Sequence, residues 1–203
     1  MPIITEMSVQ KNNKKRCNVY VDNEFFCGMS AETAVKNRIK VGQEVDAKQL
    51  EQLVLESEKY EALIKATDYI SKNLKTKRQV KDYLIKKGYS EQVAWYCIDK
   101  LKEYNYIDDA EYSKRYIESV SKRQGRRLTE YKLMMKGVRK EDIESAYLDT
   151  ADCGNESAKQ LAKKHLGSKP ITKENLAKTY RYLIGKGFTY DQAMYALADY
   201  QGE

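Results

Sequence analysis

Apolar residues recur at helical spacing on both sides of Gly88, and this pattern is the clearest structural signal in the sequence. Thr76 can cap a first helix, because Gln79 stands three residues later and completes a capping box. Leu84 lies on the apolar face of that helix, and Gly88 is expected to end it in the left-handed conformation. Ser90 should cap a second helix with a buried face formed by Val93, Ala94, Cys97, Ile98 and Leu101.

This helix ending occurs three times. Residues 84–88 (LIKKG) have counterparts at 133–137 (LMMKG) and 183–187 (LIGKG), with glycines 49 and 50 residues apart. In each copy a leucine lies four residues before the glycine, a lysine precedes the glycine, and Tyr89, Val138 or Phe188 follows it. A fixed period of about 50 residues indicates tandem helical units that bury their apolar faces on their neighbours.

The first 28 residues follow a different pattern, in which apolar and polar residues alternate as in β-strands. Strands are expected at residues 3–9, 17–21 and 24–27, joined by polar turns into a three-stranded meander. A short helix from Ser30 or Ala31 to Ile39 should follow, and Asp46 can cap a longer one. The polar residues 56–59 are expected to break that longer helix near Glu58.

These patterns together predict a mainly α fold: an elongated array of three tandem three-helix repeats, preceded by a small N-terminal β-meander module with a helix. The predicted domains are residues 1–58, 59–107, 108–152 and 153–203. The predicted repeat helices span residues 60–73, 77–87 and 91–104, then 109–123, 127–136 and 140–149, then 155–165, 173–186 and 190–200.

The charge of the chain favours a polyanionic partner, because the formal net charge is +7 and the pI is near 9.0. Residues 1–60 are neutral, whereas residues 61–150 hold 20 basic and 15 acidic residues. The four cysteines form no Cys-x-x-Cys pair and there is one histidine, so we expect no metal site, no disulfide and no cofactor. No targeting peptide or membrane-spanning segment is visible, which predicts a cytoplasmic protein.

Basic residues cluster at equivalent places in the first two repeats. Arg78 and Arg127 each stand ten residues before the glycine of their repeat, near the predicted start of a middle helix. Such a stripe suits phosphate binding, which would weaken steeply with salt. The predicted DNA- or filament-binding residues are Lys72, Lys75, Lys77, Arg78, Lys81, Lys122, Arg123, Arg126, Arg127, Lys132 and Lys136. The alternative is a solvated helix face that binds nothing.

Two sequence motifs resemble those of the RecX family, regulators of RecA recombinase. Residues 105–113 (NYIDDAEYS) resemble the family signature Y-[IL]-D-D-x-x-[FY]-[AS], and Gly125 to Val138 resembles its G-x-R…L-x-x-K-G-[IV] element. Residues 19–24 and 41–46 are similar to segments of members from Gram-positive bacteria. The chain departs from the family at Arg126, usually proline, at Lys132, often glutamate, and at Ala177, where the third repeat lacks an arginine.

The resemblance implies a non-enzymatic modulator of recombination, DNA repair and the SOS response. Family members bind the filament of RecA on single-stranded DNA, lie in its helical groove, mainly inhibit RecA, and also bind DNA directly. It implies no cofactor and no membrane partner, and possible contact with double-stranded DNA as well. Tandem repeats with their own ends favour a monomer. The sequence leaves open which face would meet DNA and which RecA.

Two other functional classes fit the sequence less well. A metal-dependent nuclease could use Asp108, Asp109 and Glu111, but adjacent aspartates point in different directions on a helix and also suit helix capping. His165 fits a helix C-terminal residue better than a catalytic base, and neither G-x-S-x-G nor a P-loop is present. The main alternative is a generic DNA- or RNA-binding helical-repeat adaptor with no recombinase partner.

Overall fold

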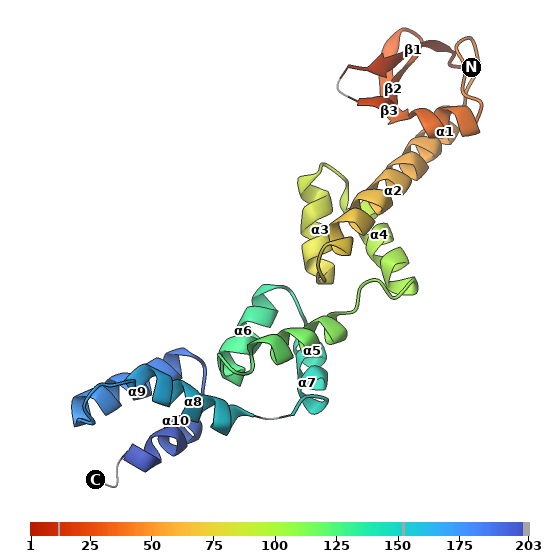
Figure 1. Ribbon diagram of the computed structural model, residues 1–203. Helices are drawn as coiled ribbons and strands as arrows, with labels where there is room; N and C mark the ends of the chain where they lie inside the picture. Colours follow the sequence, from red (N-terminus) through yellow and green to blue (C-terminus); the bar gives the residue numbers. More distant parts are fainter. Residues whose placement is uncertain (12, 152, 201–203) are drawn as a thin grey trace. The chain divides into compact units, whose positions relative to one another are not determined.

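A computed structural model describes residues 1–11, 13–151 and 153–200 of the chain (Figure 1). The chain forms two compact units, Met1–Asn73 with Val80–Tyr106, and Leu74–Gln79 with Ile107–Glu203. The first turn of helix α3 therefore belongs to the second unit. Among the described residues, no helix is both long enough and apolar enough to cross a membrane.

The described residues confirm the predicted fold class, a mainly helical chain with three strands at its N-terminus. The strands are β1 (Ile4–Gln10), β2 (Asn13–Val21) and β3 (Glu24–Ser30). The helices are α1 (Ala31–Lys36), α2 (Ala47–Ser71), α3 (Lys77–Lys86), α4 (Glu91–Glu103), α5 (Asp109–Val120), α6 (Arg126–Met135), α7 (Lys140–Leu148), α8 (Gly154–Leu166), α9 (Lys173–Gly185) and α10 (Tyr190–Leu197), followed by a 3₁₀ turn at Ala198–Tyr200.

The strands form the predicted meander, an antiparallel sheet in the order β1-β2-β3. Asp22 and Asn23 connect β2 to β3 with φ angles of 50° and 67°, values that short polar side chains tolerate in tight hairpins. One face of the sheet packs on α1 and the start of α2. The core there contains Ile4, Cys17, Val19, Cys27, Met29, Ala34, Ile39, Val45 and Leu50.

Helix α2 passes through Glu58 without interruption, so the predicted helix break there is wrong. Ser57 of this stretch and the nearby Glu61 contact the sheet module. Ser57 is buried, and its Oγ accepts a hydrogen bond from the backbone N–H of Ser30 at 2.9 Å. Glu61 forms an ion pair with Arg16 of β2. The helix continues because glutamate and lysine are good helix formers, and the hydroxyl of the buried Ser57 has a partner outside the helix.

The three middle helices α3, α6 and α9 end in the same way. Gly88, Gly137 and Gly187 have φ angles of 90°, 83° and 88°, as the sequence predicted. The residue after each glycine donates its backbone N–H to the carbonyl of the repeated leucine, at 3.2, 3.1 and 3.2 Å. This hydrogen bond is typical of a Schellman ending. The motif also brings two apolar side chains together, and here the repeated leucine and the residue after the glycine are buried in every copy.

Each of the last two repeats has its own core. Ile117, Leu133, Val138, Ile143 and Ala146 form the core of α5–α7, and Ala158, Ala162, Leu183, Phe188, Ala193, Ala196 and Leu197 form that of α8–α10. Helix α5 ends three residues earlier than predicted, at Val120. Asp152, the predicted boundary residue, and residues 201–203 lie outside the described residues. The predicted domain boundaries remain predictions.

Replacing Ser57 by alanine should destabilise the first unit. The substitution leaves the buried N–H of Ser30 without a partner, at a cost of about 1–3 kcal/mol in the free energy of unfolding. Urea unfolding followed by circular dichroism measures the effect. Ser71→Ala, at an exposed position of the same helix, is the matched control. Equal stability of the two variants would contradict the role given to Ser57.

Candidate nucleic-acid interface

The first turn of α3 lies on the C-terminal end of α6. Thr76 caps α3 through the predicted capping box with Gln79, and its Oγ1 donates to the carbonyl of Lys136 at 2.7 Å. The side chain of Arg78 covers Gly137 so closely that a Cβ at that glycine would collide with it. The left-handed ending of α6 therefore serves as a docking surface for the start of another helix. We call this contact the first joint.

A second joint connects the start of α6 to the end of α9, through backbone N–H groups instead of a threonine side chain. The backbone N–H of Gly125 donates to the carbonyl of Lys186 at 2.9 Å, and that of Arg127 donates to the carbonyl of Gly187 at 3.2 Å. Leu128 covers Gly187, as Arg78 covers Gly137. A Cβ on Gly125 would collide with the backbone of Gly187 and Phe188. Both joints thus place the basic first turn of one helix on the end of the next middle helix.

Asp109 connects the first joint to α5. Its Oδ1 accepts from the backbone N–H of Lys77 at 3.0 Å, and its Oδ2 lies 3.9 Å from the Lys77 ammonium. The residue is 2% exposed, and burial raises the pKa of its carboxyl group although Lys77 opposes the shift. Asp108, not Asp109, caps α5, by accepting from the N–H groups of Ala110 and Glu111.

The lysine before each repeated glycine lies over a tyrosine ring. Lys87 is 5.6 Å from the ring centroid of Tyr83, and Lys186 is 5.3 Å from that of Tyr182. In the middle repeat the corresponding tyrosine position holds Lys132, and Lys136 lies 5.8 Å from Tyr116 of α5 instead. The repeated lysine is therefore held by its helix dipole and by an aromatic face.

The first predicted basic cluster is divided between the two units. Lys72 and Lys81 belong to the first unit, whereas Lys75, Lys77 and Arg78 belong to the second. Lys81 is half-buried between Glu91, at 3.1 Å, and the ring of Trp95. Within the second unit, the structure brings Lys77 and Arg78 together with the end of α6 at Lys136.

The second predicted cluster lies at the start of α6, within the second unit. Lys122, Arg123 and Arg127 are exposed. Arg126 pairs with Glu130 at 2.6 Å and lies 4.4 Å from the ring centroid of Tyr147, beside a hollow of about 280 Å³. Lys132 donates to Gln124 at 2.7 Å. Arg123 also donates to the carbonyl of Ser119 at 2.9 Å, a bond within the same turn of the chain that leaves its side chain exposed.

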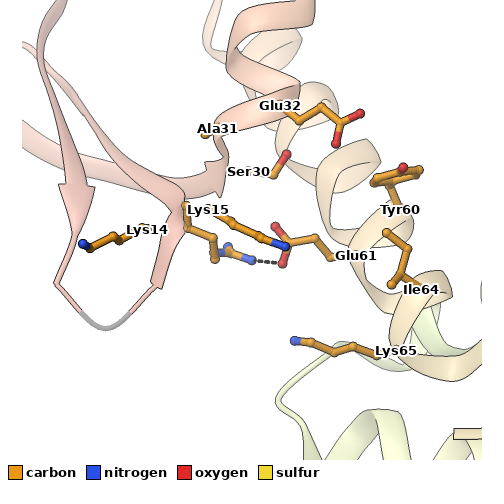
Figure 2. A pocket seen from close by; sticks show the side chains of 10 residues that line it. Lys14, Lys15, Ser30, Ala31, Glu32, Tyr60, Glu61, Ile64 and Lys65 are labelled. Atoms are coloured by element: carbon orange, nitrogen blue, oxygen red, sulfur yellow. Dashed lines mark hydrogen bonds and ion pairs between the residues drawn. The ribbon is translucent and has the colours of Figure 1, made fainter. Parts of the chain in front are cut away.

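The sequence reasoning missed a third group of cations, on the N-terminal module. Lys14, Lys15 and Arg16 of β2 line a cavity of about 530 Å³ together with Tyr60, Ile64 and Lys65 of α2 (Figure 2). Arg16 and Glu61 form an ion pair, and both line this cavity. The Lys-Lys-Arg run was the available signal, but the neutral charge of residues 1–60 as a whole concealed it.

The alternative nuclease site does not assemble. Asp108 caps α5, and the buried Asp109 accepts a hydrogen bond from the backbone N–H of Lys77. Glu111 forms an ion pair with Arg115 at 2.6 Å. The described residues contain no group of three or more His, Cys, Asp or Glu side chains that could hold a metal ion. His165 lies near the end of α8, stacked on Tyr182 and 3.0 Å from Thr179, and burial lowers its pKa.

Comparison with protein families gives matches along most of the chain. Residues 2–46 match the regulatory protein RecX N-terminal domain. Residues 62–101, 108–146 and 155–197 match the first, second and third three-helix domains of RecX. Each of the three helix endings falls within a different one of these matches.

Curated relatives and solved structures match over most of the chain. The regulatory protein RecX of Clostridium botulinum (strain Eklund 17B / Type B) is 40% identical over 197 residues, covering 94% of this chain and 92% of its own. That of Clostridium tetani is 38% identical, over 93% of this chain and 89% of its own. A crystal structure of regulatory protein RecX aligns over both entire chains with a TM-score of 0.68 and 23% identity. RecX from Lactobacillus salivarius, at 24% identity, has a TM-score of 0.64 and covers 71% of this chain and 97% of that one.

Replacing Gly125 by alanine should weaken the second joint. Gly125 has an ordinary φ of −79°, so alanine meets no local strain, but its Cβ would collide with the backbone of Gly187. Overpacking of this kind costs about 1–3 kcal/mol in the free energy of unfolding, measurable by urea denaturation. Gly185→Ala is the control, because nothing lies within 4 Å of a Cβ there and the helix should gain up to about 1 kcal/mol. A neutral effect of Gly125→Ala would contradict the joint.

Proposed function

The chain belongs to the RecX family of regulatory proteins, and on that premise we propose that it binds the filament of RecA recombinase on single-stranded DNA and limits RecA activity. The family supports a regulatory role in RecA-related processes. In this proposal the protein acts in recombination and DNA repair by binding to the RecA filament, without catalysis and without a cofactor.

The observation that carries the proposal is the recurrence of cations at the two joints. Lys77 and Arg78 begin α3, and Arg126 and Arg127 begin α6. Arg78 covers the ending of α6 at Gly137, and the backbone N–H of Arg127 donates to the carbonyl of Gly187 at the ending of α9. The first joint uses the side chain of Thr76 and the second uses backbone N–H groups, but both bring a basic helix start to a glycine ending, so cations recur at both joints. A polymer with a repeated phosphate backbone is the ligand that suits such recurrence, because weak contacts add when they are linked.

Exposed tyrosines supply a second kind of surface for the recombinase. Tyr104, Tyr106, Tyr131, Tyr190 and Tyr195 are each about half exposed or more. Tyrosine is enriched in protein interfaces because it combines a large apolar ring with a polar tip. In the proposed division of roles, the cations face DNA phosphates, and the tyrosine and acidic surfaces face RecA subunits.

Charge reversal of Arg123, Arg126 and Arg127 to glutamate should weaken binding to single-stranded DNA. Loss of three phosphate contacts would also reduce the slope of log affinity against log salt by about two. Fluorescence anisotropy with a labelled oligonucleotide over a salt series measures both. Because Arg126 also pairs with Glu130, the unfolding midpoint of the variant is compared with that of the unchanged protein.

Lys36, Lys40 and Lys48, all exposed and outside the predicted stripe, provide a control with the same change of net charge. Their reversal to glutamate should alter affinity less and leave the salt slope nearly unchanged. An unchanged affinity and slope for the arginine variant would reject this stripe as the DNA-binding face.

Inhibition of the RecA ATPase on single-stranded DNA separates a recombinase regulator from a generic nucleic-acid adaptor. We expect inhibition at protein concentrations far below those needed to cover the DNA, because a regulator acts on the filament. A protein that only coats DNA would inhibit after the strand is covered. Inhibition that follows DNA coverage would therefore favour the adaptor.

A further inference from the structure

The N-terminal module and α2 border a cavity whose lining residues all belong to the first unit. Its volume of about 530 Å³ lies within the range of roughly 300–1,000 Å³ that is typical of ligand sites. One wall is strand β2 with Lys14 and Lys15, and the other is a face of α2 (Figure 2). We call it the hairpin cavity. None of the predicted DNA- or filament-binding residues lines it.

Cations outnumber carboxylates around the hairpin cavity. Arg16 and Glu61 form an ion pair, so their charges largely cancel. Lys65 donates to the hydroxyl of Tyr89 at 2.8 Å, a neutral partner that leaves the lysine charge in place. The charged residues that line the cavity are Lys14, Lys15, Arg16 and Lys65 with Glu32 and Glu61, four cations and two carboxylates, a net charge of +2. The cavity therefore favours a ligand with negative charge.

Tyr60 and Ile64 give the α2 wall an exposed apolar surface. They lie four residues apart, so they share one face of the helix, and they are 50% and 46% exposed. Tyr69 and Tyr83 of the same unit stack on each other. Among the described residues, by contrast, neither a cation nor a second ring lies over Tyr60. A planar group of a ligand can therefore stack on this ring.

The unpaired acidic charge of the cavity lies on the Tyr60 side. Glu32 and Tyr60 together line a smaller neighbouring hollow, and Figure 2 shows both on the side away from Lys14. In the same view the ammonium group of Lys65 points away from α2, toward the hairpin. This arrangement suits a ligand with a neutral planar part and a separate phosphate, because the phosphate can lie at the lysines. A peptide rich in carboxylates suits it less, since some of its charges would face Glu32.

We propose that the hairpin cavity binds a nucleotide of single-stranded DNA. The base stacks on Tyr60 and Ile64, and the phosphates lie beside Lys14, Lys15 and Lys65. The choice of ligand rests on the proposed function, to which the cavity adds a nucleotide site outside the predicted stripe. Every base has a π-face, so the site contributes affinity without sequence preference.

A photochemical cross-link tests the stacking directly. A short oligothymidylate that carries one 5-iododeoxyuridine reacts on irradiation with an aromatic side chain in contact with the modified base. With the full-length protein, mass spectrometry of the digested adduct should place a cross-link on Tyr60, and Tyr60→Leu should abolish it. Phe25→Leu, at a 61% exposed aromatic position of β3 outside the cavity, should leave the cross-link unchanged. Adducts found only on other peptides would overturn the proposal.

The affinity for an oligonucleotide separates the two parts of the site. Tyr60→Leu keeps an apolar side chain but removes the ring, so Kd should rise about fivefold or more while the salt slope stays the same. Lys14→Gln combined with Lys65→Gln removes two cations, so Kd should rise and the slope of log affinity against log salt should fall by about 1.4. Fluorescence anisotropy over a salt series measures both.

Lys40→Gln combined with Lys48→Gln, at exposed positions outside the cavity, is the control with the same change of charge. It should alter the affinity and the slope less. Because Lys65 also donates to Tyr89, the unfolding midpoints of the variants are compared with that of the unchanged protein. Tyr60→Leu and the cross-link remain decisive if the lysine variant is destabilised. Unchanged affinity for both cavity variants would overturn the proposal.

Two other ligands are distinguished by the same assay. If a glutamate-rich peptide or free thymidine monophosphate binds at the cavity and the oligonucleotide does not, the proposal is wrong. The outcome is also separate from that of the proposed function. Weak binding by the arginine variant of the stripe with normal binding by the cavity variants would remove this site alone, and the reverse result would remove the stripe alone. Inhibition of the RecA ATPase tests the regulatory role independently of both.

Discussion

The left-handed glycine that closes each middle helix is the constraint on which the repeats depend. It turns the chain out of the helix, so that the next residue can bury its side chain against the repeated leucine. It also removes the Cβ that would block a neighbouring helix, which leaves the last carbonyl groups of α6 and α9 open to incoming donors. One backbone conformation therefore fixes the end of a helix, the core of its repeat and the place where another helix begins.

Features that depend on neighbouring residues were predictable from the sequence, and features that depend on distant residues were not. The capping box at Thr76, the stop at Gly88 and the three-stranded meander are local, and the structure contains all of them. The partner of Asp109 is Lys77, 32 residues away, so spacing along one helix could not identify it. The same reason explains the error at Glu58, because Ser57 is satisfied by Ser30 across the fold.

The candidate site was predictable as a list of cations but not as an arrangement. The sequence located the basic residues at the starts of α3 and α6, where Arg78 and Arg127 are each the second residue of their helix. It did not show that Arg78 covers Gly137 whereas Leu128, not Arg127, covers Gly187. It could not show that Lys81 is held between Glu91 and Trp95, or that Arg126 is held between Glu130 and Tyr147. The contacts with Glu91, Trp95 and Tyr147 depend on side chains from other helices, whereas the pair of Arg126 with Glu130 lies within α6. Each of these contacts is of modest strength, and together they hold Lys81 and Arg126 in place. Lys122, Arg123 and Arg127 are exposed.

The second joint is built from main-chain atoms, with Gly125 and Arg127 donating to the carbonyl groups of Lys186 and Gly187. Recognition of this kind specifies a backbone shape and little side-chain identity. Gene duplication within such a chain carries both halves of the connection with it, since every unit brings a helix start and a glycine ending. An added or deleted unit would consequently meet compatible ends on either side, and repeat number is a quantity that evolution can change without inventing a new contact.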